Sequence, residues 1–95
     1  SDMLDRALRE ARVEAERMVL ATRAALAADG DLLCEEERAA IEALIEATLE
    51  RARSEDAAAV DAAVKALADG TEAFAAERMN RGIREALAGR RVEEV

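Results

Sequence analysis

The sequence predicts an all-α protein, an antiparallel bundle of three helices with a long first and a long third helix. The chain has no proline and is rich in alanine, leucine, glutamate and arginine, the residues that lose least free energy in a helix. Apolar residues recur at alternating steps of three and four, which is the spacing of one helix face. Its 95 residues suffice for one small domain, so we expect a single helical domain over residues 1–95.

The first helix is expected over residues 2–29. Gly30 follows it and is suited to ending a helix, because glycine takes positive φ without steric cost. Glutamate and arginine fill the positions between the apolar ones. The apolar or small residues of the predicted inner face are Leu4, Leu8, Ala11, Ala15, Met18, Val19, Thr22, Ala25 and Leu26.

The second helix is expected over residues 35–53. Cys34 and Glu37 have the spacing of a capping box, with the cysteine where serine usually stands. Ser54 or Asp56 then caps the third helix. The predicted inner face of the second helix consists of Ile41, Leu44, Ile45, Thr48, Leu49 and Ala52.

The third helix is expected as one long element over residues 56–88, followed by a flexible tail over residues 89–95. A bend or break near Gly82 is left open, because an internal glycine costs about 1 kcal/mol relative to alanine. The pattern that supports one helix runs through Val60, Val64, Leu67, Thr71, Phe74, Arg78, Met79, Ile83 and Leu87.

The predicted second helix is shorter than its neighbours, so the two long helices extend past it at opposite ends. Leu4 and Leu8 lie at one end; Met79, Ile83 and Leu87 lie at the other. Exposed apolar stripes of this kind mark contact surfaces, and these residues are therefore candidate interaction residues. We expect the isolated chain to self-associate as a dimer.

No catalytic chemistry is predicted. The chain lacks histidine, which is the usual general base and a common metal ligand, and Cys34 is its only cysteine. Its glycines are scattered and form no phosphate-binding loop. We therefore predict no catalytic, cofactor-binding or metal-binding residue, and no enzyme.

Charge and hydropathy exclude other classes of partner. A formal charge of −8 argues against nucleic acid, which needs clustered lysine and arginine. Charged residues interrupt every apolar run, so no membrane span is predicted. A single cysteine fits a reducing compartment, and we expect a cytoplasmic location.

Four segments together resemble the end of a known family. They are ALAAD at residues 25–29, LLCEEER at 32–38, FAAERMN at 74–80 and VEEV at 92–95. The chain resembles the C-terminal helical lid of the HscA branch of the DnaK-type heat-shock chaperones, which act in iron–sulfur cluster assembly.

The resemblance implies a non-catalytic lid that covers a client peptide and modulates its release. The lid would close on the β-sandwich subdomain of its parent chain. The implied client is an IscU-type scaffold protein, held by a Leu-Pro-Pro-Val-Lys segment and delivered by an HscB-type co-chaperone. ATP and Mg²⁺ would bind in the nucleotide-binding domain of the parent, outside these residues.

Glu16 falls at the position of an acid that latches DnaK-type lids onto the sandwich. Arg17 and Leu20 stand where that family has histidines, so an ordinary solvated glutamate remains the alternative for Glu16. The alternative function for the whole chain is a free-standing helical adaptor or dimerisation domain.

Overall fold

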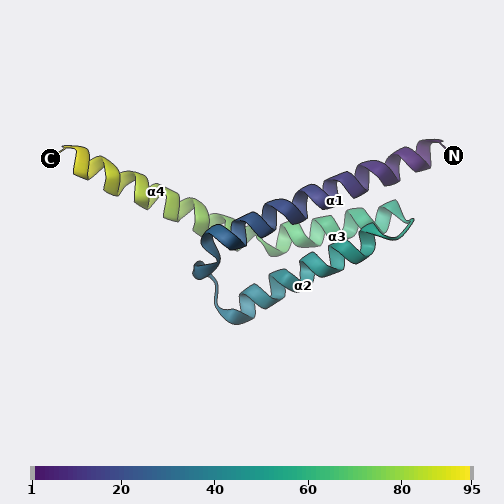
Figure 1. Ribbon diagram of the computed structural model, residues 1–95, viewed down its shortest axis with the longest axis horizontal. Coiled ribbons are helices and arrows are strands. Elements are labelled where there is room, and N and C mark those ends of the chain that lie inside the picture. The colour runs from purple at the N-terminus through teal and green to yellow at the C-terminus, as the bar shows by residue number, and fades with distance from the viewer. Residues whose placement is uncertain (1, 95) are drawn as a thin grey trace.

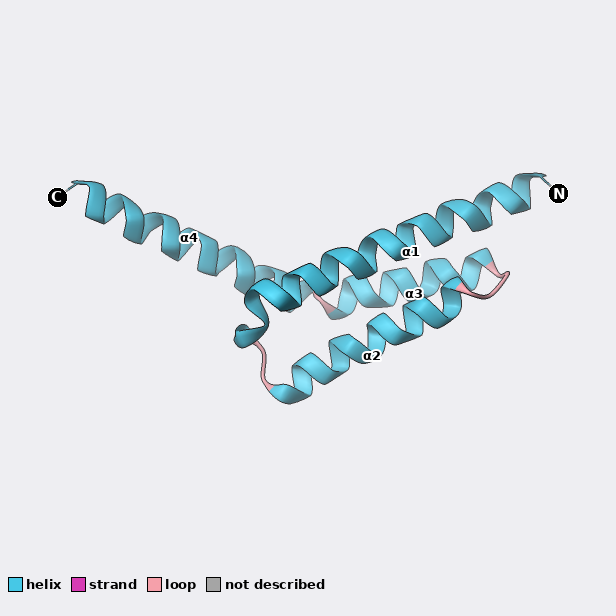
Figure 2. Cartoon of the chain, in the orientation of Figure 1, coloured by secondary structure: helices cyan, strands magenta, loops and turns pink. Residues whose placement is uncertain are grey.

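The computed structural model describes residues 2–94, with their side chains over residues 2–89 (Figure 1). No strand occurs within residues 2–94, and the predicted all-α class is confirmed (Figure 2). The elements in chain order are α1 (Asp2–Asp29), the short 3₁₀ helix η1 (Gly30–Leu32), α2 (Glu35–Ala52), α3 (Ala57–Gly70) and α4 (Glu72–Glu94).

The first three α-helices form the body of the molecule. α2 runs antiparallel to α1 and α3, and these three helices pack against one another (Figure 1). α4 points away from this body, so the two ends of the chain lie at opposite ends of a molecule that measures 64 × 29 × 17 Å. The antiparallel arrangement is confirmed, and α4 extends one end of it.

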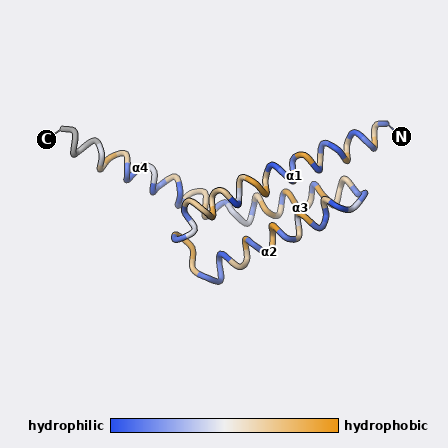
Figure 3. The backbone as a smooth tube through the Cα atoms, in the orientation of Figure 1, coloured by the Kyte–Doolittle hydropathy of each residue, from blue (hydrophilic) through white to orange (hydrophobic). Residues whose placement is uncertain are grey.

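The main core forms where the three predicted inner faces meet. Apolar and polar positions alternate along each helix, as expected for amphipathic elements (Figure 3). The side chains buried together in this core come from every α-helix. They are Val19, Ala25, Leu26, Ile41, Ile45, Leu67 and Phe74.

A second, smaller cluster lies toward the N-terminal end of α1. Ala11 and Ala15 of α1 pack on Val60 of α3, whose side chain is fully buried. Small residues let the two helices approach closely here, at the expense of apolar area buried per residue. The first half of α1 is therefore held mainly by α3.

Local hydrogen bonds define the starts of α2 and α3. The predicted capping box forms: the backbone N–H of Cys34 donates to Glu37 Oε1 at 2.9 Å. This bond lowers the pKa of the Glu37 carboxyl. Asp56 caps α3, since its Oδ1 accepts from the backbone N–H groups of Ala58 and Ala59 at 3.1 and 3.3 Å.

The expected third helix over residues 56–88 is in fact two helices that break at Thr71. Thr71 leaves the helical region, with φ −109° and ψ 2°, and its hydroxyl donates to the carbonyl of Leu67 at 2.9 Å. Gly70 precedes it and has no Cβ where the side chain of Leu44 packs against the backbone of α3. The close approach of α2 at Gly70 and the side-chain bond of Thr71 place the break here.

Two further expectations about this region differ from the structure. Gly82 lies inside α4 and does not break it. α4 also continues to Glu94, where a flexible tail over residues 89–95 is expected from the sequence; Val95 lies outside the described residues. Gly82 has no neighbouring side chain within 4 Å, so no packing contact acts there to bend the helix.

Arg12 joins α1 to the end of α2. Its Nε donates to the carbonyl of Ala52 and its Nη2 to the carbonyl of Ser54, both at 2.9 Å. The last carbonyls of a helix lack partners within the helix and carry a partial negative charge, so a guanidinium stabilises them.

Candidate interaction surfaces

The predicted residues of α1 differ in exposure. Leu4 is 70% exposed near the start of α1, and Met3 beside it is 81% exposed. Leu8 is half-buried because it packs on the cluster of Ala11, Ala15 and Val60. α3 thus covers part of Leu8, contrary to the expectation that nothing inside the bundle covers it, and the exposed apolar surface at this end is centred on Met3 and Leu4.

Glu16 lies on α1 at the edge of its contact with α2, beside the buried Val19. It is exposed and lines a shallow groove of about 240 Å³ between α1 and α2. Leu20 and Arg23 of α1 and Leu49 of α2 line the same groove. The structure therefore places Glu16 on an accessible surface, apart from Leu4 and from α4.

The predicted residues of α4 form an apolar stripe, defined here as Met79, Ile83 and Leu87. Their side chains are 69%, 52% and 51% exposed. Residues four apart lie on one side of a helix, so the three form a continuous line. The stripe is in α4 and Leu4 is in the first turn of α1, and these two segments lie at opposite ends of the molecule (Figure 1).

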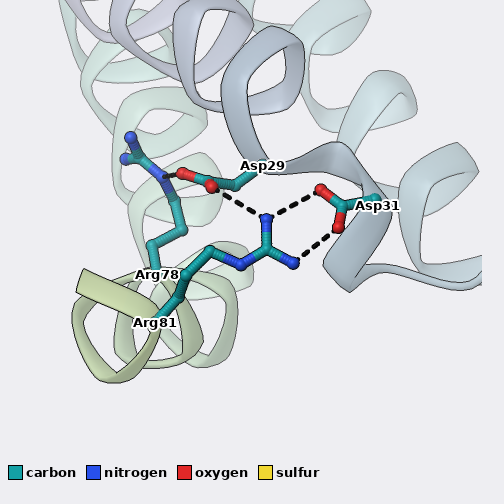
Figure 4. Close-up of polar contacts among 4 residues, drawn as sticks. All are labelled: Asp29, Asp31, Arg78 and Arg81. Atoms are coloured by element: carbon teal, nitrogen blue, oxygen red, sulfur yellow. Dashed lines mark hydrogen bonds and ion pairs between the residues drawn. The ribbon is translucent and has the colours of Figure 1, made fainter. Parts of the chain in front are cut away.

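Four charged side chains hold α4 to the corner between α1 and η1 (Figure 4). Arg78 Nε donates to Asp29 Oδ2 at 2.8 Å. Arg81 Nη1 donates to Asp29 Oδ1 at 3.1 Å and to Asp31 Oδ1 at 2.9 Å, while its Nη2 donates to Asp31 Oδ2. Arg81 thus binds the two carboxylate oxygens of Asp31 with its two terminal nitrogens, Nη1 and Nη2. This two-bond geometry is the one in which a guanidinium matches a carboxylate best.

The same contacts shift the acidities of this Asp–Arg cluster. The hydrogen bond from Arg78 holds the pKa of Asp29 below its ordinary value, and Arg81 adds to the effect. The hydrogen bond from Arg81 likewise lowers the pKa of Asp31, and both carboxylates raise the pKa of Arg81. Arg78 also lies over the ring of Phe74, at 5.9 Å from its centroid. The cluster and the buried ring together set the position of α4.

Sequence reasoning missed this cluster. Its partners are 49 to 52 residues apart, so no local spacing connects them. The only signal is the series Leu67, Thr71, Phe74, Arg78 and Arg81, which continues the inner face of α3 and ends in two arginines. A basic end to an apolar face indicates an acidic partner but does not identify it.

We expect Arg81→Ala to loosen α4 from the body while leaving the three-helix core folded. The substitution removes three hydrogen bonds to Asp29 and Asp31 and leaves the bond from Arg78 to Asp29, together with the buried Phe74, to hold α4. Amide hydrogen exchange should become faster over residues 72–81 and unchanged at Ile41 and Ile45. Arg84→Ala is the matched control, because Arg84 is exposed and lies outside the cluster. Equal exchange in the two variants would contradict the role of the cluster.

Acid should have the same effect as Arg81→Ala. A carboxyl whose pKa is lowered on folding stabilises the fold above its unfolded pKa, and that stabilisation is lost as pH falls through the folded value. For Asp29 and Asp31 this loss occurs below their ordinary pKa of 3.8. Hydrogen exchange of α4 should therefore be insensitive to acidification between pH 7 and about 5, after correction for intrinsic rates, and increase below about pH 4.

Within residues 2–94 no group of three or more His, Cys, Asp or Glu residues is arranged to hold a metal ion. Cys34 is an exposed free thiol. Among the described helices, none is long and apolar enough to cross a membrane. The surfaces available to a partner are therefore the exposed first turn of α1, the groove at Glu16 and the α4 stripe.

Comparison with known proteins points to one group of chaperones. No protein-family model matches the chain. Over 94 residues, 99% of the chain, it is 82% identical to a chaperone protein HscA homolog of Methylibium petroleiphilum. It is 61% identical over the same share to the homolog of Burkholderia thailandensis, and 62% identical over 92 residues to that of Verminephrobacter eiseniae. The matched region is in the C-terminal part of these relatives and spans about 15% of their length.

Proposed function

We propose, from the similarity of this chain to the C-terminal part of the HscA chaperones, that it is the helical lid of such a chaperone. The lid closes over a β-sandwich of the parent chain and thereby lengthens the time for which a client peptide stays bound. It opens and closes as a rigid body, driven by nucleotide in another domain of the parent. The lid itself has no catalytic role.

The observation that best supports this proposal is the construction of α1. It is a single helix of 28 residues without an internal break. Its C-terminal half is fixed in the core through Val19, Ala25 and Leu26, while its first turn exposes Met3 and Leu4. A helix that the bundle holds along most of its length, with an exposed apolar first turn, is suited to docking that turn on another domain. The bundle then moves with the helix as one body.

We assign separate roles to the candidate residues of α1. Leu4 and the exposed part of Leu8 would pack on the sandwich when the lid is closed. Glu16 would act as a latch that pairs with a donor of the sandwich, and its exposure leaves it accessible for this role. A charge-assisted bond of this kind adds orientation to the non-directional apolar contact.

The wider setting is also a proposal from the resemblance. The client would be an IscU-type scaffold protein of iron–sulfur cluster assembly, delivered by an HscB-type co-chaperone. The location would be the cytoplasm. ATP and Mg²⁺ would bind only in the nucleotide-binding domain of the parent chain.

The test is the dissociation rate of a labelled Leu-Pro-Pro-Val-Lys peptide from the full-length parent chaperone. Leu4→Ser should accelerate dissociation by about tenfold or less, since about 1.4 kcal/mol of lost docking corresponds to tenfold. Glu16→Gln should accelerate it as well if the acid is a latch, and leave it unchanged if the residue is only solvated. Peptide release that is unchanged by deletion of this whole segment would contradict the lid function.

Val13→Ser provides the control. Val13 is 52% exposed on α1 and lies half a turn away from Leu4 around the helix. It is an apolar residue of the same helix on the side opposite Leu4, so it is the control for the apolar contact of Leu4. Its substitution should leave peptide release at the wild-type rate.

A further inference from the structure

α4 presents its apolar stripe on the side opposite its contacts with the body. At 100° per residue, Met79, Ile83 and Leu87 point about half a turn away from the residues that hold α4 in place, Phe74 and Arg81 among them. The bundle therefore cannot cover the stripe in this arrangement. Ala76 and Ala86, both exposed, lie on the same side and leave room for another helix to approach.

Charge is distributed so that α4 is the neutral part of an acidic protein. Residues 72–94 contain five basic and five acidic residues: Arg78, Arg81, Arg84, Arg90 and Arg91, with Glu72, Glu77, Glu85, Glu93 and Glu94. The whole chain has 14 basic and 22 acidic residues, which leaves nine basic and 17 acidic residues before α4. The entire net charge of −8 thus belongs to the body, and α4 projects away from it (Figure 1).

From these two observations we propose that the α4 stripe is a docking surface for α4 of a second copy of this chain, in antiparallel orientation. A two-fold axis through Ile83 would pair it with the same residue of the second copy, and would pair Met79 with Leu87 in both directions. Such a contact is self-complementary, as closed dimers require. All three exposed side chains of each copy would be covered.

Electrostatics selects the antiparallel orientation. The acidic body of each copy lies at the N-terminal end of α4, so antiparallel helices place the two bodies at opposite ends of the pair. A helix of 23 residues is about 34 Å long, and exposed charges are screened over about 8 Å at physiological salt. A parallel pair would instead bring two bodies of charge −8 side by side.

The pairing is expected to be weak. A single helix pair covers less surface than the roughly 1,200–2,000 Å² of stable protein complexes. The dimer should therefore form at high concentration and dissociate on dilution. This inference does not rest on the proposed lid function, because it concerns the opposite end of the molecule.

Sedimentation equilibrium from micromolar to millimolar concentration tests the surface. Wild-type protein should shift from monomer toward dimer, and Ile83→Ser should reduce the association constant by about tenfold or more. Leu20→Ser is the matched control: Leu20 is 68% exposed on α1, away from α4, and its substitution should leave association unchanged. Circular dichroism verifies that both variants stay folded. A monomer at millimolar concentration, or equal weakening by both variants, overturns the proposal.

Disulfide trapping tests the orientation in a Cys34→Ser background, which retains a residue able to cap α2. Met79→Cys and Leu87→Cys variants are mixed and oxidised. Antiparallel pairing predicts the mixed disulfide between the two variants in preference to either homodimer. Preferential homodimers of each variant would indicate a parallel pair and overturn the proposed orientation.

Discussion

Phe74→Ala is expected to destabilise the protein by about 3–5 kcal/mol. Phe74 is the only aromatic residue of the chain and is 4% exposed. It extends from the first turn of α4 into the core beside Ala25, Ile41 and Leu67. Its removal leaves a cavity at the end of the bundle where α4 begins, and α4 loses the buried side chain that holds it to the core. The measurement is the urea midpoint of the circular dichroism signal at 222 nm.

Two further variants separate anchoring from helix content. Phe74→Leu retains most of the volume and should cost less than about 1.5 kcal/mol. Met79→Ala alters an exposed residue of α4 and should change stability by less than about 0.5 kcal/mol. If Phe74→Ala and Met79→Ala gave equal midpoints, the burial of the ring and its role in holding α4 would be disproved.

The parts of the fold that depend on local sequence were predictable. The buried residues of α1, including Ala15, Val19 and Thr22, all lie on the face that the spacing predicts. The capping box at Cys34 and Glu37 also forms as predicted. Both signals act over one or two helical turns, where residue type and spacing suffice to determine which groups meet.

The direction of α4 was not predictable from such signals. Thr71 stands at a position of the inner face where a continuous helix would also place it. The apolar spacing therefore gives no sign of the break. What ends α3 is the packing of Leu44 at Gly70, together with the hydroxyl bond from Thr71 to Leu67. These contacts depend on the position of α2 and become visible only once the bundle is assembled.

The candidate surfaces also divide into features that the sequence predicts and features that depend on the packing of distant segments. Exposure of the α4 stripe follows from helix lengths, because no other predicted helix reaches that far. Partial burial of Leu8 depends instead on α3 beginning at Ala57, which brings Val60 against the first half of α1. The ion pairs of Arg81 join segments 50 residues apart and required the structure.

Leu44 and Leu67 both lie on the inner faces that the apolar spacing predicts, yet they differ in burial. Leu67 has no exposed surface and lies in the main core with Ile45 and Phe74, whereas Leu44 is half-buried at the edge of that core. Leu67→Ala should therefore cost about 2–5 kcal/mol, because the surrounding helices cannot collapse into the space it leaves. Leu44→Ala should cost less, since part of its side chain is already in contact with water. Urea midpoints of the two variants compare them directly, with Arg53→Ala as an exposed control expected to change stability by less than about 0.5 kcal/mol. Equal losses from both leucines would place the centre of the core between α2 and α3 near Gly70 and away from Leu67.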